Sequence, residues 1–139
     1  MIRLLALAAA TFMISACGAW VTKYDMESNA MIRADISPES REQIISALEK
    51  LSEKHKFQII VQRKDEHAPM AFNIMMRDNR FSVDATNLPR PSLLQVAFFK
   101  ARNPDIRPSD EELESLVQEF SLSLDALDGV EVTSAELTP

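Results

Sequence analysis

Apolar residues recur at helical spacing between residues 37 and 56 of this chain. Ser37 and Pro38 supply an N-cap hydroxyl and a first-turn proline, and Glu39 lies beside the positive helix end. Basic residues close the last turn, where His55 suits the helix dipole. The pattern predicts an amphipathic helix whose buried stripe is Ile44, Ile45, Leu48 and Leu51.

A second helix is predicted from residue 109. Ser109 to Glu112 has the sequence of a capping box, in which a serine hydroxyl and a glutamate three residues later satisfy free backbone N–H groups. Gly129 is placed to end the helix in the left-handed conformation. The expected apolar stripe is Leu113, Leu116, Val117, Phe120, Leu124 and Leu127.

Elsewhere apolar and polar residues alternate with period two, which predicts strands. The expected strands are 31–36, 57–62, 72–76, 81–85 and 130–133, with a loose tail from Ala135 to Pro139. Residues 77–80 have the composition of a hairpin connection. Residues 92–101 form a dense apolar run that fits a buried strand, although a short helix capped by Ser92 is the alternative.

This order of elements predicts the α+β class. Neighbouring antiparallel strands with two amphipathic helices favour a two-layer sandwich, in which a mostly antiparallel sheet carries both helices on one face. The arrangement resembles a ferredoxin-type split β-α-β unit with an added hairpin. That resemblance is one of topology and implies no function.

The strand alternation also predicts the composition of both sheet faces. Toward the helices we expect Phe57, Ile59, Val61, Phe72, Ile74, Met76, Phe81, Val83, Val96 and Phe98. Away from them we expect Gln58, Ile60, Gln62, Asn73, Met75, Ser82, Gln95, Ala97 and Phe99.

An exposed apolar patch with a polar rim is typical of an interaction surface, which makes Ile60, Met75, Ala97 and Phe99 the candidate partner face. The alternatives are that residues 20–35 cover this face or that the strand register differs. Basic residues at strand ends are expected to frame the face and to suit an acidic partner, namely Arg63, Lys64, Arg77, Arg80, Lys100 and Arg102.

Charge is unevenly distributed along the 139 residues. The formal net charge is −6, and residues 108–139 contain nine acidic residues and no Lys or Arg. An acidic end argues against nucleic-acid binding, which needs a basic surface. Hydrophobic content of 46% with 26% charged residues indicates a globular chain, and residues 30–139 suffice for a single α+β domain.

The first residues have the organisation of a secretory leader. A basic start at Arg3 precedes an apolar run from Leu4 to Ile14, which is shorter than the roughly 20 residues of a membrane-spanning helix. The run ends in Ile14-Ser15-Ala16-Cys17. This organisation alone is also compatible with an ordinary secreted protein that keeps a leftover cysteine, or with a cytoplasmic protein that has an apolar N-terminal helix.

The sequence Ile14-Ser15-Ala16-Cys17 resembles the cleavage site of bacterial lipoproteins. The resemblance covers the leader only, and it implies removal of residues 1–16 as a signal peptide and acylation of Cys17. Residues 17–29 would then connect the membrane to the domain. Gly18 in the next position implies delivery to the outer membrane, facing the periplasm.

The sequence contains little that indicates catalysis. With two glycines there is no glycine-rich phosphate loop, and the one cysteine is the expected anchor. We therefore predict neither an enzyme nor a bound cofactor. The leading hypothesis is an anchored module that binds an envelope protein. The alternative is a small-ligand or metal-binding lipoprotein using Glu66, His67 and nearby methionines, although a solvated turn and core packing of Met70, Met75 and Met76 explain these residues more simply.

Overall fold

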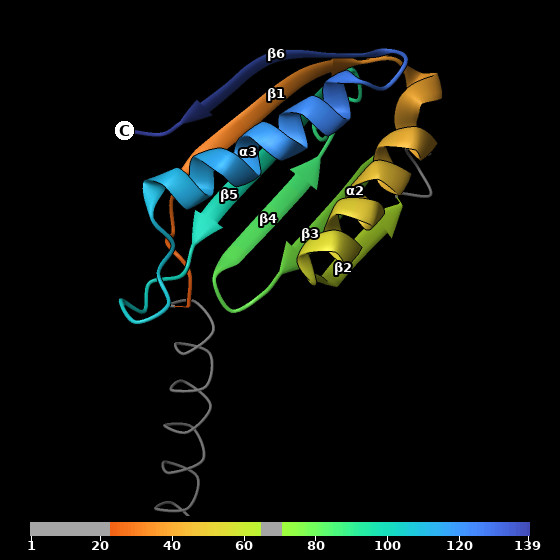
Figure 1. Cartoon of the computed structure of the whole chain (residues 1–139). Coiled ribbons are helices and arrows are strands. Elements are labelled where there is room, and N and C mark those ends of the chain that lie inside the picture. The colour runs from red at the N-terminus through yellow and green to blue at the C-terminus, as the bar shows by residue number, and fades with distance from the viewer. Residues whose placement is uncertain (1–22, 65–70) are drawn as a thin grey trace, which may run out of the picture.

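Six strands form one antiparallel sheet in this computed structural model, which describes residues 23–64 and 71–139, the side chains of 61–64 excepted. The sheet order is β2-β3-β4-β5-β1-β6, and two α-helices accompany it (Figure 1). The predicted α+β class and antiparallel sheet are confirmed. The elements are β1 (Ala30–Ile36), the 3-10 turn η1 (Pro38–Ser40), α2 (Arg41–His55), β2 (Gln58–Lys64), β3 (Phe72–Arg77), β4 (Phe81–Thr86), β5 (Leu93–Lys100), α3 (Asp110–Asp125) and β6 (Val130–Leu137).

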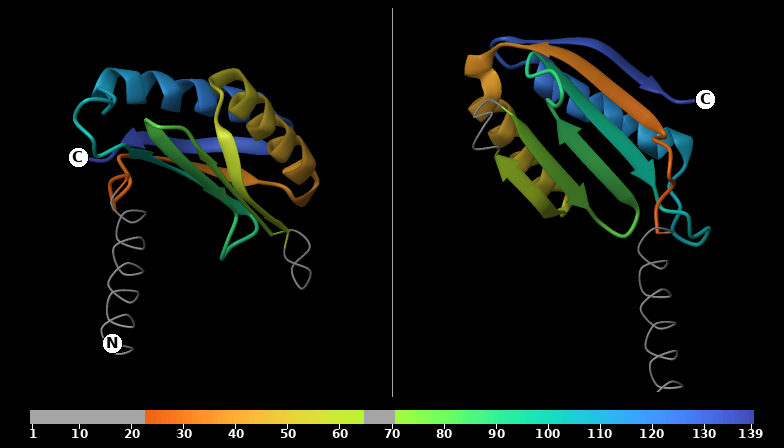
Figure 2. Two further views of the ribbon diagram at one scale, coloured as in Figure 1. Left: turned by 90° about the horizontal axis from the view of Figure 1, so that it is seen from below. Right: turned by 180° about the vertical axis from the view of Figure 1, so that it is seen from behind.

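Both helices lie on the same side of the sheet (Figure 2), and their apolar stripes supply nine of the 24 buried residues of the core in the described part of the chain. The predicted stripe of α2 is buried in full, and that of α3 is buried from Leu113 to Leu124 with Leu127 partly buried. Phe120 of α3 meets Phe98 of β5 edge to face, with ring centroids 5.3 Å apart. Such pairs add to the free energy gained by burying the two rings.

Residues 93–100 form a strand, as predicted, and the helical alternative is wrong. β5 pairs with β4 on one side and with β1 on the other, so that it lies inside the sheet. Buried and half-buried residues alternate along it, with Leu94, Val96 and Phe98 toward the helices. Bulky apolar residues suit a strand that is enclosed on both edges.

The last strand is longer than predicted. β6 continues to Leu137, which lies opposite Ala30, so the loose tail expected from Ala135 is wrong. Pairing with β1 holds this segment, and Leu137 packs against the core. Alternation is interrupted at Thr133, where the register shifts between Arg33 and Ala34, which is why the pattern gave no clear strand beyond this point.

The predicted ends of both helices need correction. Ser37 begins the short turn η1 without a side-chain cap, and α2 starts at Arg41. Gly129 has the expected positive φ of 76°, but α3 already ends at Asp125 and Gly129 belongs to the turn before β6. The two residues touch: Ser37 N–H donates to the Gly129 carbonyl at 2.8 Å, and a Cβ on Gly129 would lie 2.2 Å from Ser37 Oγ. A contact between distant segments thus decides both local conformations.

A register shift in β2 corrects the predicted faces. Ile59 lies opposite Met76, but Val61 lies opposite Met75, so Ile60 is the additional residue of a bulge. Val61 therefore occupies a register position on the face away from the helices, and Gln62 lies opposite the inward Ile74. Both residues were assigned to the other face because uninterrupted alternation was assumed. The remaining inward positions are buried or partly buried as predicted.

Candidate functional site

The candidate partner face is the side of the sheet away from the helices, which Figure 2 shows from behind. Strand register places Met75 beside Asp84 and Asp84 beside Ala97, in one row across β3, β4 and β5. Phe99 lies in the next row opposite Ser82, and Ile60 is at the bulge opposite Met75. The structure thus brings the four predicted residues to neighbouring positions.

These four side chains differ in exposure. Ile60 is 45% exposed, whereas Met75, Ala97 and Phe99 are half-buried by their neighbours. No helix within the described ranges lies over this face (Figure 2). Residues 30–35, which the covered-face alternative would fold across it, form strand β1 inside the sheet. In the described part of the chain the face is therefore open.

Asp84 is a central member of this face that the sequence analysis missed. Its Oδ1 atom is buried and has no hydrogen-bond partner. Desolvation raises the pKa of this carboxyl above its ordinary value, and the Arg77 guanidinium offsets part of that rise. The alternation with Ser82 already placed Asp84 on the outer side, so its position was predictable. The absence of a partner was not, because it depends on side chains from neighbouring strands.

Arg77 closes one end of the face. Its Nε donates to Ser82 Oγ at 3.0 Å, which buries the serine, and its guanidinium lies 5.3 Å from the centre of the Tyr24 ring. The Tyr24 hydroxyl donates to the Asp78 carbonyl, and burial raises the pKa of Tyr24. Residues 23–29, assigned to a connector, thus pack against the strand ends, and Asp25 pairs with Arg107 through two hydrogen bonds.

The expected basic frame is wrong for two of its members. Lys100 points to the helix side, where it pairs with Asp110, and Arg80 binds both carboxylate oxygens of Glu112 at 2.8 and 2.7 Å. Hydrogen bonding from Arg80 lowers the pKa of Glu112. Both acids lie in the first turn of α3, where negative charge is stabilised by the helix dipole. These cations therefore hold α3 to the sheet, while the side chains of Arg63 and Lys64 lie outside the described part.

The histidines do not form a site in the described residues. His55 lies in the last turn of α2, as predicted, and its Nε2 is 2.7 Å from Glu119 Oε2 of α3. The same glutamate accepts a hydrogen bond from Lys54, the main cause of its lowered pKa. His67, with Glu66 and Met70, lies outside the described residues, as does Cys17.

The methionines of β3 give no support to the metal-binding alternative. Met75 and Met76 point to opposite sides of the sheet, as expected from the alternation, and Met76 is fully buried in the core. No group of three or more His, Cys, Asp or Glu suited to a metal occurs within residues 23–64 and 71–139.

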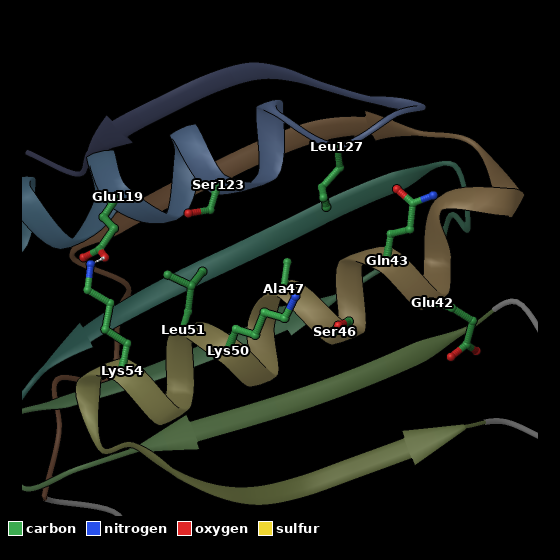
Figure 3. Close-up of a pocket in the computed structure, with 10 residues that line it drawn as sticks. All are labelled: Glu42, Gln43, Ser46, Ala47, Lys50, Leu51, Lys54, Glu119, Ser123 and Leu127. Carbon is green, nitrogen blue, oxygen red and sulfur yellow. Dashed lines mark hydrogen bonds and ion pairs between the residues drawn. The ribbon is translucent and has the colours of Figure 1, made fainter.

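A groove of about 710 Å³ runs between α2 and α3 (Figure 3). Its walls carry both charges, with Lys50 and Lys54 on α2 and Glu119 on α3, and the Lys54–Glu119 pair crosses one end. Leu51 and Leu127 also line the groove. Glu42 also lines the groove, so two basic and two acidic side chains balance each other and give no charge preference that would define a ligand.

Comparison of the chain with protein-family models and with curated proteins finds no match. No helix in the described part of the chain combines the length and the hydrophobicity that a bilayer crossing requires. Fold and site together define a small α+β protein with a six-stranded antiparallel sheet, one face of which is open in that part.

Proposed function

We propose that this protein is a non-enzymatic lipoprotein of the outer membrane, anchored through Cys17 and facing the periplasm, that acts by binding another envelope protein. The observation that best supports this proposal is the open face of the sheet. Its apolar members Ile60, Met75, Ala97 and Phe99 adjoin one another in the register and are bordered by polar residues. Such patches are typical of protein interaction surfaces.

The anchor hypothesis is supported by the leader and by the position of the single cysteine. An apolar run that ends in two small residues and Cys17 is typical of a lipoprotein leader. Two or more acyl chains on that cysteine would hold the domain stably at the membrane surface. Anchoring concentrates the domain near its partner, so that a modest contact surface suffices for binding.

We also infer that the fold is a two-layer variant of the ferredoxin-type arrangement. β5 and β6 are both antiparallel to β1, so they run parallel to each other with β1 between them. Helix α3 connects them, which gives a split β-α-β unit. The additional strands β2, β3 and β4 extend the sheet on its other side.

Charge substitutions on the face test the proposed function. Ile60→Asp and Phe99→Asp place a carboxylate in the apolar patch, and we expect each to reduce in-cell crosslinking to the envelope partner at least tenfold while leaving the circular dichroism spectrum unchanged. A photo-reactive amino acid introduced in place of Gln95, on the same face, forms the crosslink to the partner.

The matched control is Leu122→Asp, since Leu122 is 64% exposed on α3, on the helix side of the molecule. It should leave crosslinking unchanged. Equal crosslinking in all variants would exclude the sheet face as the contact surface, and loss of helical signal in Phe99→Asp would assign that residue to the core instead.

A further inference from the structure

We propose that a small cavity beside Arg41 binds a small organic carboxylate, and that the Arg41 guanidinium is the group that recognises it. The cavity lies where η1 joins α2 and meets the connection between β4 and β5, away from the candidate partner face. The inference is independent of the proposed function.

The cavity has a volume of about 270 Å³, which suits a ligand of a few carbon atoms. Its walls are mainly apolar, and Ser37, Asn87 and Ser92 are the uncharged polar residues that line it together with the arginine. The lining residues are Ile36, Ser37, Pro38, Arg41, Asn87, Pro91 and Ser92. A mostly apolar pocket with few polar groups is the usual form of a small-molecule site.

The Asn87 side chain fixes one wall of this cavity. Its Oδ1 accepts a hydrogen bond from Phe72 N–H at 2.7 Å, and its Nδ2 donates to the Pro91 carbonyl. Ile36 N–H in turn donates to the Ser92 carbonyl at 2.9 Å, which joins β1 to the same connection. The cavity is therefore held by hydrogen bonds from three segments of the chain.

The Arg41 guanidinium is buried and only partly hydrogen-bonded. Its side chain is 14% exposed, and Nη1 pairs with Glu42 Oε1 at 2.9 Å. Nε and Nη2 are buried and have no hydrogen-bond partner. These two nitrogens form one edge of the guanidinium plane, and two parallel N–H bonds from such an edge match the two oxygens of a carboxylate.

Arg107 shows the two-nitrogen arrangement that Arg41 lacks, because its Nη1 and Nη2 donate to the two carboxylate oxygens of Asp25. Buried donors without partners destabilise a protein, and a buried charge does so more strongly. A carboxylate at the Nε–Nη2 edge would supply the acceptors that these two nitrogens lack.

The apolar walls favour an organic acid over an inorganic anion. Ile36, Pro38 and Pro91 offer no hydrogen bonds from their side chains to the further oxygens of a phosphate, whereas they can bury a short hydrocarbon chain. The ligand class is therefore a monocarboxylate with a short apolar tail.

Thermal unfolding of the purified full-length protein in detergent tests this assignment. Sodium butyrate should raise the unfolding temperature of the wild type in a saturable way, because a ligand that binds only the folded state stabilises it. Sodium chloride and sodium phosphate at equal ionic strength, and butyramide, should give no saturable rise. A saturable rise with phosphate but none with butyrate would overturn the carboxylate assignment, and no rise with butyrate at any concentration would overturn the site.

Substitutions of Arg41 test whether butyrate raises the unfolding temperature by binding at this cavity. Arg41→Gln and Arg41→Lys both lack the paired donor edge and should need at least roughly tenfold more butyrate for the same rise. Arg102→Gln, at an exposed arginine elsewhere, should respond like the wild type. An unchanged response in both Arg41 variants would overturn the proposal. Without ligand, Arg41→Lys should unfold within a few degrees of the wild type, and a large loss of stability would assign Arg41 a structural role.

Discussion

The charged side chains of this protein differ in how fully their polar atoms are hydrogen-bonded. Arg80, Lys100 and Arg107 each have a carboxylate partner at the strand ends. Asp84 and Arg41 each keep buried polar atoms without a partner, one on the open sheet face and one beside a cavity. Since native proteins satisfy most buried polar groups, the present surroundings of these two charged residues cost stability.

Replacing Asp84 with asparagine should stabilise the isolated protein at neutral pH. The pKa of Asp84 is raised by desolvation, so its contribution to folding is most favourable at low pH, where the group is neutral, and is lost as the pH rises through that pKa. We expect Asp84→Asn to raise the free energy of unfolding by up to about 1 kcal/mol at pH 7, with the gain vanishing towards about pH 3.

Urea unfolding between these pH values measures the difference. Asp105→Asn, at an exposed residue of a loop, is the control and should change stability little at any pH. A gain for Asp84→Asn that is equally large at low pH would show that the carboxylate charge is not its cause.

Single residues were predictable where only local alternation decides them. Met75 and Met76 point to opposite faces as the period of two requires. The ion pair of Lys100 was not predictable. Its partner Asp110 belongs to the following helix, α3, and the sequence does not indicate which strand ends lie next to that helix. Residue-level charge roles therefore had to come from the structure.

Helix ends show the same division between local and tertiary causes. The capping box of α3 was predicted correctly because Ser109 and Glu112 are three residues apart: Ser109 Oγ accepts from Glu112 N–H at 3.1 Å, and Glu112 Oε2 accepts from Ser109 N–H at 2.8 Å. The start of α2 was missed because Ser37 contacts Gly129, far along the chain. The bulge at Ile60 was missed because register is a property of two strands.

Removal of the α3 cap should destabilise the protein measurably. Ser109→Ala eliminates the acceptor for Glu112 N–H, and loss of such a cap costs about 1 kcal/mol, equivalent to a fall of about 4 °C in the unfolding temperature. Ser115→Ala, at an exposed position within the same helix, is the control and should be neutral or slightly stabilising. Calorimetry of the three proteins makes the comparison, and equal unfolding temperatures would mean that the cap adds nothing to stability.

At the scale of the whole molecule, the order of elements along the chain was predictable but the order of strands in the sheet was only partly so. The hairpin of β3 and β4 follows from its short connection, in which Asp78 Oδ1 accepts from the N–H groups of Arg80 and Phe81. The place of β1 between β5 and β6 does not follow, because both neighbours lie far away in sequence. Because β1 pairs within the sheet, it does not cover the face away from the helices, and that face is open in the described part of the chain.

The anchor hypothesis makes a prediction for the whole molecule. If Cys17 carries lipid, the mature wild-type chain should begin at Cys17, exceed its residue mass by several acyl chains, and fractionate with outer membranes. Cys17→Ser removes the acylated atom, and the apolar run before it is shorter than a membrane-spanning helix, so most of this variant should leave the membrane fraction in an alkaline wash. Gly18→Ala is the control and should stay lipidated. An unprocessed and unmodified N-terminus on the wild-type protein would contradict the anchor, and equal membrane retention of Cys17→Ser would assign attachment to the leader itself or to the partner.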